Sequence, residues 1–157
     1  MENTKQLIRF LTRAQKVGYG AGDKARKIKE KDKSKTIIFK KGDWMCHDNY
    51  FGGEPYGGRE VIFKDKKAIW IMVYYGFVDP SVENPGEIYT FLQKALSKPP
   101  EDVPLRGPKT LEDGNLKYEN SWQGALASYS GKEIITRNGK RIYEATYLGG
   151  EVDRRGE

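Results

Sequence analysis

The segment Gly58–Gly76, GREVIFKDKKAIWIMVYYG, decides the fold because a related segment, GKEIITRNGKRIYEATYLG, follows at Gly131–Gly149. Each contains two runs of β-branched and aromatic residues joined by a polar turn, and the second turn is Asn138-Gly139. Asn-Gly between such runs indicates a hairpin, since both residues tolerate the positive φ of a type I′ turn. Because the segments share the pattern G-x-E-x-I-x4-K-x-I-x4-Y-x-G, they predict two copies of one antiparallel unit. The identical pairs are Gly58/Gly131, Glu60/Glu133, Ile62/Ile135, Lys67/Lys140, Ile69/Ile142, Tyr74/Tyr147 and Gly76/Gly149.

The segments that flank the repeat also align. Apolar residues at three- and four-residue spacing predict a helix from about Thr4 to Lys16, and Asn84-Pro85 begins a second apolar stripe that runs to Leu96. Strand-like runs at 36–39 and 109–112 are expected to form hairpins with 44–51 and 116–122. Glycines and a proline make 52–58 a loop, and four prolines between 99 and 108 make an irregular connector.

These elements predict an α+β fold in which a helix-plus-antiparallel-strands unit is internally duplicated. We expect two helices, six to eight antiparallel strands and a pseudo-twofold axis, with both helices packed on a sheet built from the two halves. The chain, residues 1–157, then forms a single domain whose halves cover about 3–80 and 84–150, followed by a frayed tail at 151–157.

Strand alternation predicts which side chains face the helices. In the second half Leu116, Tyr118, Asn120 and Trp122 alternate with polar residues, so the repeat places Trp44, Cys46, Asp48 and Tyr50 inward and His47 outward in the first. The outward positions Ile71 and Val73 are apolar where the second half has Glu144 and Thr146. This asymmetry predicts either a covered face or a homodimer interface.

The net charge of +6 is concentrated in one stretch. Residues 22–35, GDKARKIKEKDKSK, hold seven basic and three acidic residues, or +4 of the total, and align with a gap in the second half. We expect a flexible, solvated loop, because Ile28 is its only large apolar residue. The alternative is a contact with nucleic acid or an acidic partner. It would use Lys24, Arg26, Lys27, Lys29 and Lys31.

Several classes of protein and site are excluded by composition. A single cysteine, Cys46, allows no intrachain disulfide, and with a single histidine, His47, it cannot form a Cys/His zinc site. We predict no metal site and no cofactor, since the chain has no phosphate-binding loop, dinucleotide fingerprint or hydrolase elbow. Without an apolar run of about 18 residues or a signal peptide, a soluble cytoplasmic protein with no membrane contact is expected.

The inward aromatic and acidic residues are the candidate site. Tryptophan and tyrosine need hydrogen-bond partners when buried, and a buried carboxylate needs a partner or a wet cavity. Core packing and structural hydrogen bonds would explain the same residues, so both interpretations stay open. The ligand-binding interpretation is a pocket for a cationic or amine-bearing small molecule. Its candidate residues are Trp44, Asp48, Tyr50, Glu60, Trp70, Tyr74, Asn120, Trp122, Glu133 and Tyr147.

Several short motifs resemble an uncharacterised prokaryotic family, a domain of unknown function. They are Gly42-Asp43-Trp44, Asp48-Asn49-Tyr50-Phe51-Gly52-Gly53, Gly58-x-Glu60-Val61, Trp70-x-Met72-x-Tyr74-Tyr75-Gly76 and Tyr147-x-Gly149-Gly150. Some members of that family are fused to helix-turn-helix DNA-binding domains, so the resemblance implies a sensor or regulatory module. It implies no catalytic residue, and this chain has no separate helix-turn-helix segment.

The function that these observations favour is a non-enzymatic small-molecule-binding or regulatory module with an aromatic, acidic pocket. Binding of nucleic acid or an acidic partner through 22–35 is the alternative, and a small hydrolase or isomerase that uses Asp48 or Glu60 is a third interpretation.

Overall fold

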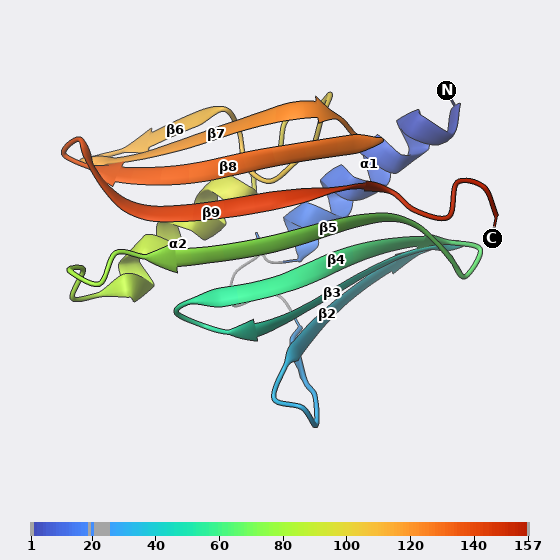
Figure 1. Ribbon diagram of the computed structural model, residues 1–157, viewed down its shortest axis with the longest axis horizontal. Coiled ribbons are helices and arrows are strands. Elements are labelled where there is room, and N and C mark those ends of the chain that lie inside the picture. The colour runs from blue at the N-terminus through green and yellow to red at the C-terminus, as the bar shows by residue number, and fades with distance from the viewer. Residues whose placement is uncertain (1, 19, 21–25, 157) are drawn as a thin grey trace.

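The computed structural model describes residues 2–18, 20 and 26–156, and within them the chain forms two helices and nine strands (Figure 1). The strand-rich α+β class is therefore confirmed. In chain order the elements are α1 (Glu2–Val17), β1 (Ile28–Lys29), β2 (Lys35–Lys41), β3 (Trp44–Gly52), β4 (Tyr56–Lys64), β5 (Lys67–Val78), α2 (Pro85–Leu96), β6 (Thr110–Asp113), β7 (Leu116–Ala125), β8 (Ser128–Arg137) and β9 (Lys140–Glu151).

All nine strands belong to one antiparallel sheet with the order β1-β2-β3-β4-β5-β9-β8-β7-β6. The first five follow chain order from one edge, and the last four follow it from the other edge toward the centre. The two runs meet where β5 pairs with β9, and Tyr74 lies directly opposite Tyr147 there. The sheet is consequently shared between the N- and C-terminal parts of the chain.

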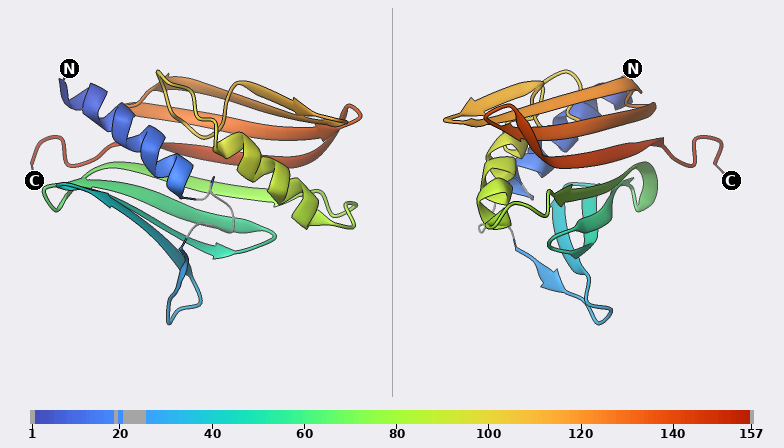
Figure 2. Two further views of the ribbon diagram at one scale, coloured as in Figure 1. Left: turned by 180° about the vertical axis from the view of Figure 1, so that it is seen from behind. Right: turned by 60° about the vertical axis from the view of Figure 1, so that its left-hand side comes forward.

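Both helices lie on the same face of this sheet (Figure 2). Helix α1 buries Leu7, Phe10, Leu11 and Ala14, and the Phe10 ring packs against Phe39 of β2 and Trp44 of β3. Helix α2 begins with Pro85 after Asn84 and buries one stripe consisting of Ile88, Phe91, Leu92, Ala95 and Leu96. The core forms between these stripes and the covered face of the sheet.

Burial along the strands follows the predicted alternation. Cys46 and Tyr50 of β3 and Met72 of β5 are buried, whereas Val73 is 45% exposed on the opposite face. Tyr75 of β5 and Leu148 of β9 are exposed as well. The imidazole of His47 is hydrogen-bonded to Arg59 on β4, and burial together with the charge of Arg59 lowers its pKa.

Two predicted boundaries and the strand number differ from the structure. The sheet has nine strands rather than six to eight, because Ile28–Lys29 of the basic stretch forms β1, which pairs with the start of β2. The tight turn between them places Lys33 at a φ of 75° and hydrogen-bonds Ser34 to Asp32. The glycine-rich loop is also shorter than 52–58, because β4 begins at Tyr56 and pairs with both neighbours. Residues 21–25, with Lys24, lie outside the described residues.

The remaining turns agree with the sequence patterns. Asp65 and Lys66 between β4 and β5, and Asn138 and Gly139 between β8 and β9, have the positive φ angles that short hairpin turns require. Strand β9 extends to Glu151, so the tail predicted from that residue begins later. In the part of the chain that the structure describes, neither helix has the length and apolar character needed to span a membrane.

Candidate functional site

A cavity of about 240 Å³ lies between the end of β3, the start of β4 and the first turns of α2. Asp48, Tyr50 and Tyr74 contribute side chains from the sheet, and Tyr89 contributes one from α2. A second cavity of about 40 Å³ adjoins it beneath α1 and reaches Glu60. Three residues border both cavities: Asp48, Tyr74 and Arg106. The larger cavity could hold a small metabolite, whereas the smaller one has room for a water molecule or a single polar group.

Asp48 is the acidic residue that both cavities share. The hydroxyl of Tyr74 donates a hydrogen bond to its Oδ1 atom. Burial raises the pKa of Asp48 to about 6, although the Tyr74 hydrogen bond and the charges of Arg106 and Arg59 oppose this shift. Near pH 7 the carboxyl group is therefore mostly ionised and poised to accept a hydrogen bond or a positive charge.

Glu60 lies directly opposite Asp48 on the neighbouring strand β4. Its side chain is half-buried, and burial together with the negative charge of Asp48 raises its pKa to about 8. Among the described residues no side chain or backbone group donates a hydrogen bond to it. At neutral pH the Asp48–Glu60 pair thus retains one proton, which is the expected state of two neighbouring carboxyl groups in a poorly solvated place.

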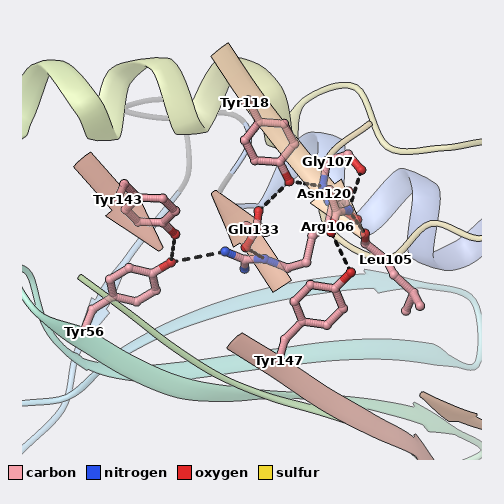
Figure 3. Close-up of polar contacts among 10 residues, drawn as sticks. Tyr56, Leu105, Arg106, Gly107, Tyr118, Asn120, Glu133, Tyr143 and Tyr147 are labelled. Carbon is pink, nitrogen blue, oxygen red and sulfur yellow. Dashed lines mark hydrogen bonds and ion pairs between the residues drawn. The ribbon is translucent and has the colours of Figure 1, made fainter. Parts of the chain in front are cut away.

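Arg106 separates this acidic pair from a second buried carboxylate, Glu133 of β8. The guanidinium Nε lies 2.7 Å from Glu133 Oε1, and both side chains are almost fully buried. Nη2 donates to the hydroxyl of Tyr56 at 3.2 Å, and that hydroxyl is 2.6 Å from the hydroxyl of Tyr143 (Figure 3). Burial tends to lower the pKa of Arg106, but Glu133 and the surrounding tyrosines raise it overall. Arg106 therefore stays protonated beside Glu133.

The backbone on either side of Arg106 is held by the C-terminal strands. Asn120 Nδ2 donates to the carbonyl oxygens of Leu105 and Gly107 at 2.8 and 2.9 Å, and the hydroxyl of Tyr147 donates to Asn120 Oδ1 at 2.7 Å (Figure 3). The hydroxyl of Tyr118 accepts from the Gly107 amide and donates to Glu133 Oε2. These contacts hold Arg106 at a φ of 65°, a conformation rare for residues other than glycine. The surroundings of Glu133 are thus filled by side chains and backbone of the protein itself.

Two glycines of the repeated pattern make room for tyrosines of this network. A Cβ atom at Gly131 would lie 2.1 Å from the Tyr147 ring, and one at Gly76 would lie 2.8 Å from the Tyr56 hydroxyl oxygen. Any larger residue would displace a ring that carries a buried hydrogen bond. The glycines of the pattern therefore serve side-chain packing as well as backbone turns.

The predicted site residues fall into three groups. Asp48, Tyr50, Glu60 and Tyr74 meet around the two cavities. Asn120, Glu133 and Tyr147 belong to the closed network around Arg106. The three tryptophans lie elsewhere: Trp44 packs on α1, Trp70 donates to the carbonyl of Leu126, and Trp122 borders a shallow hollow with Ser121 and Lys132.

Sequence reasoning missed Arg106, Tyr56 and Tyr89. Arg106 stands in the proline-rich connector, Pro104-Leu105-Arg106-Gly107-Pro108, which has no counterpart in the repeat pattern and no periodicity. A single cation among prolines and glycines was its only signal. Tyr56 stood in a predicted loop, and Tyr89 is on α2, where it donates a hydrogen bond to Glu54.

Residues 48–152, about two thirds of the chain, match the family model described as a domain of unknown function (DUF5680). The chain belongs to the DUF5680 family. No curated protein and no solved structure matches it. The resemblance to a family of unknown function is thereby confirmed; nothing in the match bears on prokaryotic origin or on fusion to helix-turn-helix domains.

The matched region contains every acidic and aromatic residue of the buried network, from Asp48 at its first position to Tyr147 near its end. Helix α1 and strand β2 precede it, yet they complete the walls around the acidic pair. Gln15 of α1 and Ile37 of β2 border the smaller cavity with Glu60. In this DUF5680 protein the site is therefore enclosed by elements on both sides of the boundary of the match.

Proposed function

We propose that this protein is a non-enzymatic binding module whose cavity takes a small cationic or amine-bearing molecule and serves a regulatory role. The observation that carries the proposal is the ionised carboxyl group of Asp48 at the wall of a cavity of about 240 Å³, with the unpartnered Glu60 beside it. The raised pKa values show that ionising these carboxyl groups in a poorly solvated place costs stability. A positively charged ligand would remove that penalty.

The aromatic walls suit the same class of ligand. Tyr50, Tyr56, Tyr74 and Tyr89 border the larger cavity, and the Tyr56 ring packs against those of Tyr74 and Tyr89 with centroids 5.9 and 5.8 Å away. Tyrosine faces attract cations and also bury alkyl groups. The negative charge that would select a cationic ligand over a neutral one comes from Asp48.

A thermal-shift screen of amines, nucleotides and common metabolites tests the proposal on three proteins. The wild type should be stabilised by a cationic compound, and Asp48→Asn, which inserts the residue found at position 120, should lose most of that shift. His47→Gln, on the opposite face of β3, is the matched control and should keep it. Absence of stabilisation by any compound, or an equal shift in Asp48→Asn, contradicts the proposal.

We also infer that the two halves are copies of one ancestral unit. The 73-residue repeat supports this inference, and so does the strand register, because Tyr74 pairs with its own equivalent, Tyr147, as a twofold axis at that point requires. Likewise Asp48 lies opposite Glu60 as Asn120 lies opposite Glu133. Separate expression of each half, followed by mixing, tests whether the units recognise each other.

The basic stretch carries the second candidate function, binding of nucleic acid or an acidic partner. In favour of it, Lys29 and Lys31 are exposed on the β1–β2 ribbon at the edge of the sheet, and Arg26 is exposed just before it. Replacing these three residues with Gln should weaken DNA binding and reduce its dependence on salt concentration. Unchanged affinity would exclude the ribbon.

The hydrolase or isomerase interpretation has one observation in its favour. Asp48 and Glu60 have pKa values near 6 and 8, so one is a base and the other an acid at neutral pH. A ligand found in the screen should be recovered chemically unchanged after long incubation with the protein, as mass spectrometry can show. Its conversion, with loss of conversion in both Asp48→Asn and Glu60→Gln, would favour catalysis instead.

A further inference from the structure

The cavity that the proposed function assigns to an amine is lined by charged side chains of both signs. Its deep end is acidic, because Asp48 borders both cavities and Glu60 lies behind it. Its other charged lining side chains include Lys35 of β2, whose ammonium nitrogen lies 5.9 Å from the centre of the Tyr50 ring. They also include Glu54, whose carboxylate already accepts hydrogen bonds from the Val78 amide and the Tyr89 hydroxyl. The presence of Asp48 and Lys35 in one lining carries an inference about the ligand.

The acidic end has unused hydrogen-bonding capacity. Tyr74 occupies Asp48 Oδ1, and within the described residues no group donates to Oδ2 of Asp48 or to the carboxyl group of Glu60. Glu60 is half-buried and borders the smaller cavity. These oxygens are open to the cavities rather than sealed in the core, so a donor that comes from outside the chain can reach them. An ammonium group has three donors and fits a space of this size.

Arg106 does not supply that donor. Its Nε is bonded to Glu133 and its Nη2 to Tyr56, and its guanidinium group lies over the Tyr74 ring at 5.3 Å. The charge of Arg106 acts to lower the pKa of Asp48 and of Glu60, yet both pKa values stay above their ordinary values, so the pair still lacks positive charge beside it. A cationic group is therefore still needed at Asp48.

The position of Lys35 relative to Asp48 is fixed by strand register. Lys35 lies opposite Tyr50, and Asp48 is two residues before Tyr50 on the same strand. Diagonal neighbours of this kind have Cα atoms roughly 7–8 Å apart. The two charges thus flank the Tyr50 side of the cavity at a distance that a short molecule can span.

We infer that the ligand is a zwitterion, an amine-bearing carboxylate of amino-acid type, with its ammonium group at Asp48 and its carboxylate toward Lys35. The inference rests on the proposed function and narrows it. A second ammonium group, as in a diamine, would meet Lys35 and be repelled, and a simple carboxylate would leave Asp48 without a donor. Complementary charge at both ends selects the zwitterion over either.

Binding of the ammonium group is linked to loss of a proton from the acidic pair. Near pH 7 the pair holds one proton, and a cation beside it favours the doubly ionised form. The ionisable and charged groups that act on Glu60 are Cys46 and Asp48 of β3, Tyr74 of β5, Tyr129 of β8 and Arg106 of the connector. Of these, only Asp48 and Glu60 have a pKa near neutrality, so the released proton comes from this pair.

Calorimetric titration with matched probes tests the inference. The probes are glycine, 4-aminobutanoate, 5-aminopentanoate and 6-aminohexanoate as zwitterions, pentylamine as the monoamine, 1,5-diaminopentane as the diamine and pentanoate as the acid. The proteins are the wild type, Lys35→Glu, and Lys40→Glu, which makes the same charge change at an exposed residue of β2 outside the described cavities. Titrations in two buffers of different ionisation enthalpy measure proton release.

In the wild type at least one zwitterion should bind about tenfold more tightly than the monoamine and more tightly still than the diamine, with proton release. Lys35→Glu should reverse the order of zwitterion and diamine, and Lys40→Glu should leave it unchanged. Unchanged order in Lys35→Glu overturns the inference. Failure of all these probes, while a different cation from the thermal-shift screen binds through Asp48, also overturns it and leaves the proposed function standing. If no compound binds, both fail.

Discussion

The first and second halves of the sheet bring the same three aligned positions together, but the side chains there have different partners. In the first half Asp48 lies opposite Glu60 and accepts a hydrogen bond from Tyr74, beside a cavity. In the second half Asn120, Glu133 and Tyr147 occupy the aligned positions. There the connector is inserted, and Arg106 neutralises Glu133.

The environment of a carboxylate, rather than the acid itself, therefore determines whether it has a structural role or is available to a ligand. Glu133 has a cation and a tyrosine hydroxyl as partners and is fully buried, which satisfies its oxygens. Glu60 has neither and borders a cavity. A position that needs a partner and has space for one is the position where a ligand adds most stability.

The largest expected effect on stability comes from removing the cation that pairs with Glu133 in the second half. Arg106→Met leaves Glu133 buried without its cation, and breaking a buried ion pair in this way costs about 3–5 kcal/mol of unfolding free energy. Urea denaturation at pH 7 measures this loss. In the double variant Arg106→Met/Glu133→Gln the uncompensated charge is absent, so much of the stability should return.

Recovery in the double variant is the decisive comparison. If Arg106→Met and the double variant were equally unstable, Arg106 would act through packing alone, and the contrast between a neutralised and an unpaired carboxylate would be wrong. Lys94→Met, which breaks the exposed Lys94–Asp113 pair, serves as the control and should change stability by less than about 1 kcal/mol.

The second effect concerns Glu60 and depends on pH. Its pKa rises from 4.5 to about 8 on folding, so between these values the folded state holds a proton that the unfolded chain has released. Stability from this group is therefore lost as pH rises from about 5 to 8, and the raised pKa of Asp48 adds to the loss up to about pH 6. Glu60→Gln should remove the part of the fall in unfolding free energy that is due to Glu60, which is on the order of 3 kcal/mol between pH 5 and pH 8.

Urea denaturation of the wild type and Glu60→Gln at both pH values measures the change. Glu101→Gln, at an exposed position of the connector, should show the same fall as the wild type. Parallel pH profiles for the wild type and Glu60→Gln would show that Glu60 ionises normally in the folded protein, and the contrast between the two halves would lose its electrostatic basis.

The elements that repeat were predictable from the sequence, and the element that distinguishes the halves was not. Alternation and Asn138-Gly139 predicted the hairpins, and the apolar stripes predicted both helices. The contact that distinguishes the halves is that of Arg106 with Glu133. Neither strand nor helix periodicity predicts the position of Arg106, because the backbone beside it is held by the side chains of Asn120 and Tyr118. Strand β1 was missed since its pairing follows from the Asp32–Ser34 turn rather than from apolar residues.

The smallest expected effect compares the two tyrosines at the centre of the sheet. Tyr147→Phe removes a hydrogen bond to the neutral side chain of Asn120 and should cost about 1 kcal/mol at any pH between 5 and 8. Tyr74→Phe removes one from Asp48, and since that hydrogen bond lowers the pKa of Asp48, its loss raises this pKa further. Destabilisation by Tyr74→Phe should therefore grow by about 1 kcal/mol as pH rises through about 6, where Asp48 ionises. Urea denaturation of both variants at pH 5 and pH 8 measures the two costs. Equal pH dependence in the two variants would mean that Asp48 carries no more charge than Asn120, and the first half would then be as neutral as the second.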